Sequence, residues 1–287
     1  MARRSLSLHP DSSLVPPAET IVSAAIKLSS PATRGFWEVP VLFEDEYLLA
    51  LDKPAGLLTS PDRYDPERPN LMELLHLGIG DGKPWARERR LDYLMNAHRL
   101  DPETSGVILL ARNKSTLVRL ADLFGSDKPH KQYLALVQGA PAENRFEINA
   151  ALAAHPAKPG LMYVDLKHGK RSRTFVEVLE RYSGYALLQC KPLTGRTHQI
   201  RVHLRHAGLP LVGDTCYGGR PLYLSRLKPG YRPKTNEPER PLIDLVALHA
   251  ETLSLPHPVT GEPITITAPG PKDLMVAVKY LRRYAAI

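Results

Sequence analysis

The segment NAHRLDPETSGVILLAR, residues 96–112, runs from a polar loop into a short apolar run. Its last part, Val107 to Ala111, has the length and composition of a buried strand. An amphipathic helix that opens near Asn113 or Ser115 is predicted next, because apolar residues recur at the i, i+3, i+4 and i+7 spacing. These residues are Leu117, Leu120, Ala121 and Phe124. Asp101 is therefore predicted to lie in a loop that enters a strand, on a rigid strand and helix pair.

The stretch before this segment, VPVLFEDEYLLALDKPAG at 39–56, contains two apolar runs separated by acidic turn residues, which predicts a β-hairpin. Residues 1–35 are rich in Pro and Ser. Apart from a stretch at 21–28 that fits a strand or a turn of helix, they carry no long periodic pattern. We therefore predict an N-terminal tail over 1–35 and one folded domain over 36–287.

Beyond the helix, three further strands are expected from short apolar runs bounded by Gly, Pro or charged residues. They are Tyr133 to Val137, Thr174 to Leu179 and Tyr185 to Cys190. The strands do not alternate with helices in a regular βαβ rhythm. The sequence therefore predicts an α+β fold with a mixed, largely antiparallel sheet core and flanking helices.

A last helix is predicted over 198–207, with Thr197 as its N-terminal cap. Spacings of three and four residues place His198, Arg201 and Arg205 together on one flank of that helix. This flank is a candidate surface for an acidic ligand.

The charge balance also favours an acidic partner. The chain has 287 residues, with 38 Lys and Arg against 30 Asp and Glu, a formal net charge of +8 and a sequence pI near 9.4. A polyanion such as nucleic acid suits that balance, and so does an ordinary solvated basic surface. Part of the charge lies in a Pro-rich basic insert at about 220–241. Its basic residues are Arg220, Arg226, Lys228, Arg232, Lys234 and Arg240.

Cysteine content and hydropathy bear on where the protein works. Cys190 and Cys216 are too few for a disulfide framework and lack the spacing of a zinc site, which suits a reducing cytoplasm. No apolar stretch approaches the roughly 20 residues of a membrane-spanning helix. The N-terminus lacks the apolar segment of a signal peptide. The sequence therefore predicts a soluble, cytoplasmic protein without membrane contact, and we expect a monomer.

Several enzyme classes lose support because their sequence patterns are missing. The chain contains no P-loop, no dinucleotide-binding glycine pattern, no zinc-protease H-E-x-x-H and no G-x-S-x-G nucleophile elbow. Nucleotide hydrolysis, hydride transfer and zinc hydrolysis are therefore disfavoured.

Three motifs occur in order along the chain: HRLDPETSG at 98–106, HKQYLALVQG at 130–139 and TGRTHQIRVHLRHAGLPLVGDTCYG at 194–218. Together they closely resemble the RluA family of pseudouridine synthases. The resemblance begins with VLFEDEYLLALDKPAGLLTSP at 41–61 and extends to LHAETLSLPHPVTGEP at 248–263. It implies a pseudouridine synthase catalytic fold for the folded domain and isomerisation of uridines in structured RNA, either ribosomal or transfer RNA. In this reaction the glycosidic bond breaks, the uracil turns and its C5 bonds to the same sugar carbon, so the resemblance implies no cofactor and no metal.

The resemblance also assigns catalytic roles. Asp101 matches the catalytic carboxylate of the family, which either attacks the sugar carbon or removes the 2′ proton to give a glycal; the sequence leaves both routes open. Arg201 matches the arginine that pairs with this Asp and keeps it charged. Tyr133 matches the tyrosine expected to stack on the uracil and to assist loss of the C5 proton.

Substrate contacts are expected from further basic residues of the same motifs. The target base must leave its stack to react, and Arg99 matches an arginine that fills the vacated space. Arg196 is expected to contact phosphate or backbone, and His98 to stabilise the loop or contact phosphate. The complete set is His98, Arg99, Lys131, Arg196, His198 and Arg205.

Three further features of the chain have expected supporting roles. Gly106 is expected to shape the Asp101 loop, and His249 to pack beneath it. The basic insert at about 220–241 is expected to give the RNA an extra contact.

Two other functions stay open on the sequence alone. A hydrolase of a nucleoside or glycosidic bond would need a second carboxylate near Asp101, for which Glu103 is the nearest candidate. A non-catalytic RNA-binding protein could use the same basic surface. The modified uridine itself is not specified by the motifs, because readout of RNA shape and base edges lies in variable loops.

Overall fold

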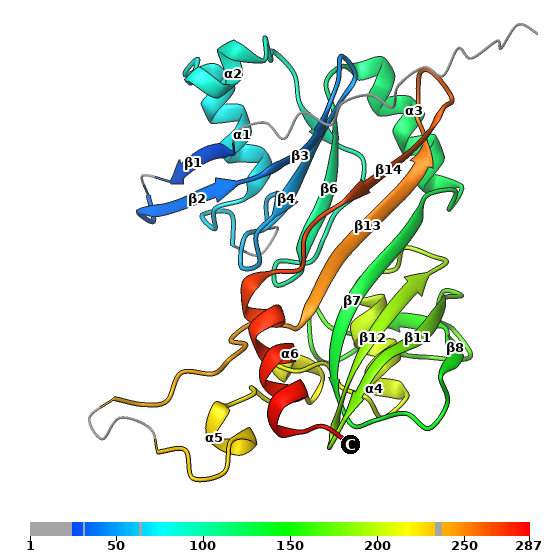
Figure 1. The fold of residues 1–287 in the computed structure, drawn as a ribbon. Helices are drawn as coiled ribbons and strands as arrows, with labels where there is room; N and C mark the ends of the chain where they lie inside the picture. The colour runs from blue at the N-terminus through cyan, green and yellow to red at the C-terminus, as the bar shows by residue number, and fades with distance from the viewer. Residues whose placement is uncertain (1–24, 31, 63–64, 233–236) are drawn as a thin grey trace, which may run out of the picture.

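The computed structural model describes residues 25–30, 32–62, 65–232 and 237–287, and a sheet of ten strands forms its centre (Figure 1). In spatial order, the strands of its main row are β3 (Val41–Glu44), β4 (Leu48–Lys53), β6 (Ser105–Ala111), β13 (Leu248–Pro256), β7 (His130–Gln138), β12 (Tyr185–Pro192), β11 (Arg173–Tyr182) and β8 (Arg145–Asn149). Two more strands attach to this row, β14 (Pro263–Thr267) on β13 and β5 (Met95–Asn96) on β6. β6 and β13 run parallel, whereas the other neighbouring pairs described in this sheet are antiparallel. The predicted α+β class with a largely antiparallel sheet is confirmed.

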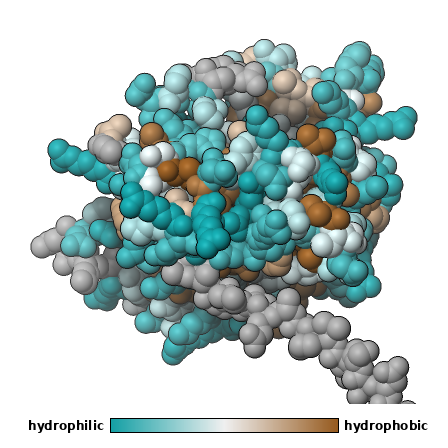
Figure 2. Space-filling model, turned by 90° about the horizontal axis from the view of Figure 1, so that it is seen from above, coloured by the Kyte–Doolittle hydropathy of each residue, from teal (hydrophilic) through white to brown (hydrophobic). Residues whose placement is uncertain are grey.

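Helices and two small two-stranded sheets surround the central sheet. The helices are α1 (Leu71–Gly80), α2 (Pro84–Glu88), α3 (Lys114–Gly125), α4 (Gln199–His206), α5 (Leu224–Leu227) and α6 (Lys272–Tyr284), with a 3-10 turn η1 (Thr215–Tyr217). The small sheets pair β1 (Ile26–Ser30) with β2 (Gly35–Val39) and β9 (Leu152–Ala154) with β10 (Met162–Val164). Within the described ranges, no helix has the length and hydropathy needed to traverse a bilayer. The face seen in Figure 2 is mainly hydrophilic, and the hydrophobic residues coloured on it form small separate patches.

Alternation along β7 divides the core into two sides. Leu134 and Leu136 pack into the cluster that contains α6, whereas Ala135 and Val137 pack into the cluster that contains α4. Successive side chains of a strand point to opposite faces, so these clusters lie on opposite faces of the sheet. Tyr133 belongs to the α4 side. The chemistry expected around Tyr133 therefore lies on the α4 face.

The basic insert at about 220–241 packs on the other face. It contains α5, and its Leu222 and Leu227 are buried in the same cluster as α6. The insert thus has a short helix and a buried apolar side although its sequence has no periodic pattern. Packing against α6 stabilises this helix, which local helix propensity alone would not. Lys234 lies outside the described residues.

β1 lies inside the segment expected to be a tail. Ile26 and Leu28 are buried at 0% and 3% exposure, and β1 pairs with β2 from Ile26 opposite Val39. The packed structure therefore begins before the expected boundary at residue 35. Residues 1–24 lie outside the described residues.

Two elements near the key motifs match their predictions, and a third differs. β6 contains the strand predicted at 107–111, and α3 begins after Asn113, whose Oδ1 accepts a hydrogen bond from the Thr116 N–H at 2.8 Å. The predicted cap of α4, Thr197, is wrong. The cap position is taken by His198, which has a left-handed φ of 51° and makes no capping bond with its side chain. His198 therefore precedes the helix and is not part of its flank.

Candidate active site

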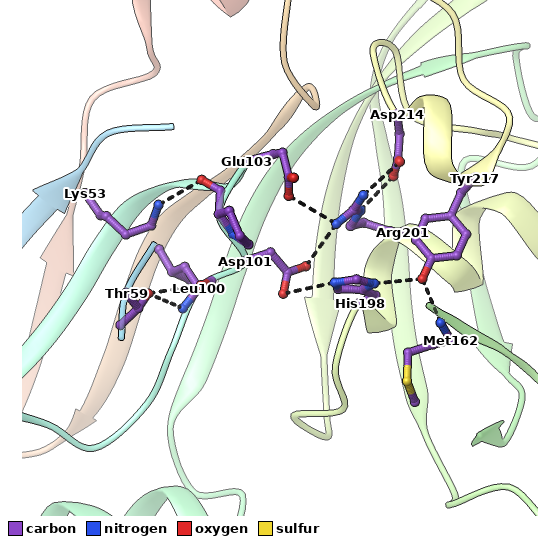
Figure 3. Close-up of polar contacts among 11 residues, drawn as sticks. Lys53, Thr59, Leu100, Asp101, Glu103, Met162, His198, Arg201, Asp214 and Tyr217 are labelled. Atoms are coloured by element: carbon purple, nitrogen blue, oxygen red, sulfur yellow. Dashed lines mark hydrogen bonds and ion pairs between the residues drawn. The ribbon is translucent and has the colours of Figure 1, made fainter. Parts of the chain in front are cut away.

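Asp101 lies in the loop between β5 and β6, and two side chains hold that loop in place (Figure 3). Lys53, at the end of β4, is fully buried, and its Nζ donates to the Pro102 carbonyl at 3.2 Å. On the other side of Asp101, the Thr59 hydroxyl donates to the Leu100 carbonyl at 3.0 Å and accepts from the Leu100 N–H at 3.2 Å. The backbone before and after Asp101 is therefore fixed.

The start of β6 fits closely against β13. Gly106 has a φ of +111°, and a Cβ at that position would collide with the backbone carbonyl of Ala250. The Ser105 hydroxyl lies 2.9 Å from Nδ1 of His249, which is buried. The structure thus agrees with the shaping role expected for Gly106 and the supporting position expected for His249.

The opposite wall of the site is the turn at 194–199 that leads into α4. Gln199 is buried and organises this turn. Its Oε1 accepts from the Thr194 hydroxyl at 2.7 Å and from the Arg196 N–H at 3.1 Å, and its Nε2 donates to the Arg173 carbonyl at 2.9 Å. The turn is thereby tied to β11 and faces the Asp101 loop as a rigid wall.

Arg201 reaches across this space, but its main partner is Asp214. The Nε and Nη2 atoms donate to Oδ2 and Oδ1 of Asp214 at 2.8 and 2.9 Å. Its Nη1 lies 3.3 Å from Glu103 and 3.7 Å from Asp101. The expected pairing of Arg201 with Asp101 is present only as a longer ionic contact, beyond hydrogen-bond distance. The guanidinium is oriented by Asp214, a residue for which the sequence predicted no role.

Three carboxylates keep Arg201 charged. Burial by itself lowers the pKa of this guanidinium, but the hydrogen bonds and charge of Asp214, with the charges of Asp101 and Glu103, raise it above its ordinary value. The Asp101 side chain is only 16% exposed. It therefore faces a permanent positive charge with little water in between.

His198 approaches Asp101 from the other direction and is held by Tyr217. Its Nε2 lies 3.9 Å from Asp101, and its Nδ1 lies 2.7 Å from the Tyr217 hydroxyl. That hydroxyl oxygen accepts from the Met162 N–H at 2.9 Å, so its own hydrogen can be donated to Nδ1. Burial lowers the pKa of His198 against the opposing charge of Asp101. A neutral ring with its proton on Nε2, directed toward Asp101, is the form these contacts favour.

The two walls enclose a cavity of about 270 Å³. Eight of the nine site residues expected from the sequence line it. They are His98, Arg99, Asp101, Lys131, Tyr133, Arg196, His198 and Arg201. The exception is Arg205, which lines a second cavity together with Tyr217. One helical turn, about 5.4 Å of rise, carries Arg205 away from the group around Asp101.

The remaining lining residues differ in charge and exposure. Burial, and after it the charge of Asp101, raise the pKa of Tyr133 above its usual range, so its hydroxyl keeps its proton at neutral pH. Burial lowers the pKa of Lys131. Arg99 and Arg196 are exposed at the surface of the cavity, where a guanidinium can meet a phosphate.

His98 is tied to the protein more closely than expected. Its Nε2 accepts from the Leu109 N–H at 2.9 Å, and its ring stacks on Phe124 with centroids 4.5 Å apart. Burial lowers the pKa of His98 to about 3, so the ring is neutral. These contacts favour the stabilising role for His98 over a phosphate contact.

The family model for RNA pseudouridylate synthases matches residues 47–206, more than half of the chain and the whole stretch from Asp101 to Arg201. The chain belongs to the RNA pseudouridylate synthase family. The synthase is thus an isomerase that converts uridine to pseudouridine in RNA, and the resemblance noted in the sequence is confirmed. The glycosidic-bond hydrolase and the non-catalytic RNA-binding protein are set aside.

Individual relatives cover most of the synthase. It is 37% identical over 250 residues to ribosomal large subunit pseudouridine synthase D of Xanthomonas campestris pv. campestris, covering 86% of this chain and 70% of the relative. It is 34% identical over 250 residues to ribosomal large subunit pseudouridine synthase C of Salmonella typhi, covering 85% and 70%. The solved structure of Human RNA Pseudouridylate Synthase Domain Containing 4 matches 88% of this chain and 94% of its own with a TM-score of 0.62, and at 23% identity that likeness is one of fold.

Lys53, Asp214 and Tyr217 support the site and were not predicted from the sequence. Each lies inside a stretch quoted for the resemblance, so a signal was present. Their contacts with Pro102, Arg201 and His198 join distant parts of the chain, which is why the motifs alone assigned them no role.

Proposed function

We propose that the synthase modifies specific uridines of structured RNA, with large-subunit ribosomal RNA as the first candidate substrate and transfer RNA as the second. The names of the relatives described above support ribosomal RNA. The basic lining of the cavity and the net charge of +8 suit either polyanion. A stacked base cannot reach Asp101, so the target nucleotide must flip into the cavity at a cost of a few kcal/mol.

The observation that carries the proposed mechanism is the placement of Asp101 beside the buried cation Arg201 in that cavity. We propose Asp101 as the catalytic carboxylate, acting either on the sugar carbon or on the 2′ proton. Arg201, fixed by Asp214, supplies positive charge where the reaction needs an ionised carboxylate. Bond cleavage, base rotation and C–C bond formation consume no water and no electrons, so we propose that no cofactor or metal takes part.

We propose that Tyr133 stacks on the flipped uracil. Its raised pKa supports this choice, because a phenol that keeps its proton can stack and donate a hydrogen bond. To accept the C5 proton it would first have to lose its own. We therefore place Tyr133 among the catalytic residues as the group that orients the base.

The cations that line the cavity are proposed to hold the RNA around the flipped base. Arg99 would occupy the space that the base leaves, and Lys131 and Arg196 would meet the neighbouring phosphates. His198 is proposed to contact the substrate beside Asp101, with its orientation set by Tyr217. His98 keeps a place in this set as the residue that fastens the loop.

We further propose that the synthase works as a cytoplasmic monomer. The composition supports this, since the two cysteines need no oxidising compartment. The catalytic domain is proposed to span 36–287, with β1 paired to β2 at its start and the residues before β1 as an N-terminal tail.

Changing Asp101 to Asn tests the assignment. The variant keeps the shape of the side chain and loses its charge, so single-turnover pseudouridine formation should fall by at least about a thousandfold while RNA binding stays within several-fold. Asp127→Asn is the matched control, because Asp127 lines the same cavity and its φ of 52° suits Asn. A rate for Asp101→Asn within about tenfold of the wild type would remove Asp101 from the chemistry.

A further inference from the structure

A second cavity lies next to the catalytic one, on the other side of Tyr217. It measures about 540 Å³ and is formed by parts of α4, β10 and η1. Tyr217 belongs to its lining, while the hydroxyl of the same residue reaches His198 in the catalytic cavity. Figure 3 shows Tyr217 between Met162 and His198, with Asp101 beyond the histidine. The two cavities therefore share one wall.

Among the described residues, the side chains in the lining of this second cavity that can carry a charge near neutral pH are those of lysine, arginine and histidine. Its lining contains His155, Lys158, Arg205 and His206 and, among the described residues, no carboxylate. In the part of the chain that the structure describes, no ion pair joins Lys158 or Arg205 to an acidic side chain. A guanidinium and an ammonium that line one cavity without such an ion pair form a setting in which a phosphate gains charge-assisted hydrogen bonds.

Aromatic rings complete the lining. Tyr163 donates its hydroxyl hydrogen to Asp165 at 3.1 Å, which fixes the ring at the cavity. Tyr217 is fixed likewise by Met162 and His198, but it is only 8% exposed and its ring centroid lies 5.1 Å from the Arg201 guanidinium. Tyr163 is therefore the ring that can receive a base. Bases of single-stranded RNA stack on such held aromatic faces, independent of their sequence. Two cations and an accessible aromatic ring together fit a nucleotide.

We propose that the second cavity binds a nucleotide adjacent to the target uridine, with its phosphate at Lys158 and Arg205 and its base against Tyr163. This inference rests on RNA being the substrate of the synthase and deepens that function. The proposal gives Arg205 a contact with the substrate in the second cavity, away from the residues around Asp101. A nucleotide seated there also touches Tyr217, whose hydroxyl sets the ring of His198.

Cys216 gives a direct readout of this cavity. The chain has two cysteines. Cys216 is exposed and lines the second cavity, whereas Cys190 is buried, and burial raises the pKa of its thiol to about 12. Iodoacetamide should therefore alkylate Cys216 selectively. The rate of alkylation reports whether the cavity is occupied.

The experiment uses the Asp101→Asn chain and a large-subunit ribosomal RNA transcript that the wild-type chain converts. Saturating transcript should slow alkylation of Cys216 by at least about fivefold, and the Lys158→Ala/Arg205→Ala double variant should lose most of this protection. The double variant should also flatten the dependence of log binding constant on log salt by roughly 0.7 for each phosphate that is no longer neutralised. Lys272→Ala/Lys279→Ala, which removes the same charge from exposed positions of α6, is the control and should keep both the protection and the slope.

Two results would overturn the inference. One is alkylation of Cys216 at the same rate with and without saturating transcript. The other is a double variant with the protection, affinity and salt slope of the control. A wild-type chain that converts no ribosomal or transfer RNA transcript is a different outcome, because it contradicts the proposed substrates and not the cavity.

Discussion

Arg201 and Asp214 form a two-point pair inside the synthase, with Nε and Nη2 bound to both carboxylate oxygens at 2.8 and 2.9 Å. Their side chains are 3% and 1% exposed. The pair fixes the plane of the guanidinium and leaves Nη1 directed to Glu103 and Asp101. Asp214 is thus the residue that determines where the positive charge of the site lies.

Asp214→Asn should damage both stability and activity. The buried guanidinium would lose its charged partner, which should lower the free energy of unfolding by about 3 kcal/mol. Single-turnover pseudouridine formation should fall by at least about tenfold at a temperature where the variant is folded, because Arg201 can then rotate. Chemical denaturation and rapid-quench kinetics measure the two effects.

The control for this variant is Asp122→Asn on the exposed side of α3, which should stay within about 0.5 kcal/mol of the wild type. An Asp214→Asn chain with unchanged unfolding and unchanged rate would show that Glu103 and Asp101 alone orient Arg201.

Tyr133→Phe and Tyr133→Leu separate stacking from the hydroxyl. Phe keeps the ring, so RNA affinity should stay within about twofold while the single-turnover rate falls, since the hydrogen-bond donor is removed. Leu should lower affinity as well, because base stacking on an aromatic ring contributes about 1–3 kcal/mol. If both variants react at the wild-type rate, Tyr133 is only a packing residue.

Asp52, which lies outside the catalytic cavity, makes the stability of the synthase depend on pH. Burial raises the pKa of Asp52 from 3.8 to about 6, against the opposing charge of Lys53 and a hydrogen bond from the Gly106 backbone. The folded state binds this proton more tightly than the unfolded state, so the free energy of unfolding falls as the pH rises from 3.8 to about 6.

Asp52→Asn removes the charge and keeps an acceptor for Gly106. It should be more stable than the wild type above about pH 7, by roughly 1 kcal/mol once solvent near this half-buried carboxyl is allowed for. The difference should shrink toward about pH 4, where Asp52 of the wild type is itself protonated. Urea denaturation at both pH values tests this, and a variant less stable than the wild type at the higher pH would contradict it.

The basic insert should contribute little to RNA binding. It packs with α6 on the face of the sheet opposite Tyr133. Changing Arg226, Lys228 and Arg232 together to Ala should therefore leave RNA affinity within about twofold and the salt slope unchanged. This differs from the RNA contact that the sequence of the insert predicts. A slope flattened by roughly 0.7 or more would restore that interpretation.

The sequence by itself determined several of the elements and the family. Apolar spacing located β6 and α3, and Asn113 marked the start of α3, because these features depend on residues a few positions apart. The three motifs, in their order, indicated the family, and eight of the nine site residues predicted from them line the cavity. Each motif is a run of consecutive residues, so it can be found in a single sequence.

Tertiary structure alone decided how those residues are paired and on which side they lie. Asp214 pairs with Arg201, and Arg205 lines the second cavity, because α4, β10 and η1 pack together in the folded chain. Tertiary contacts likewise place the insert on the α6 face of the sheet and pair β1 with β2. Distances between side chains and the face of a sheet that a segment covers depend on contacts between elements remote in sequence, and local periodicity carries no information about them.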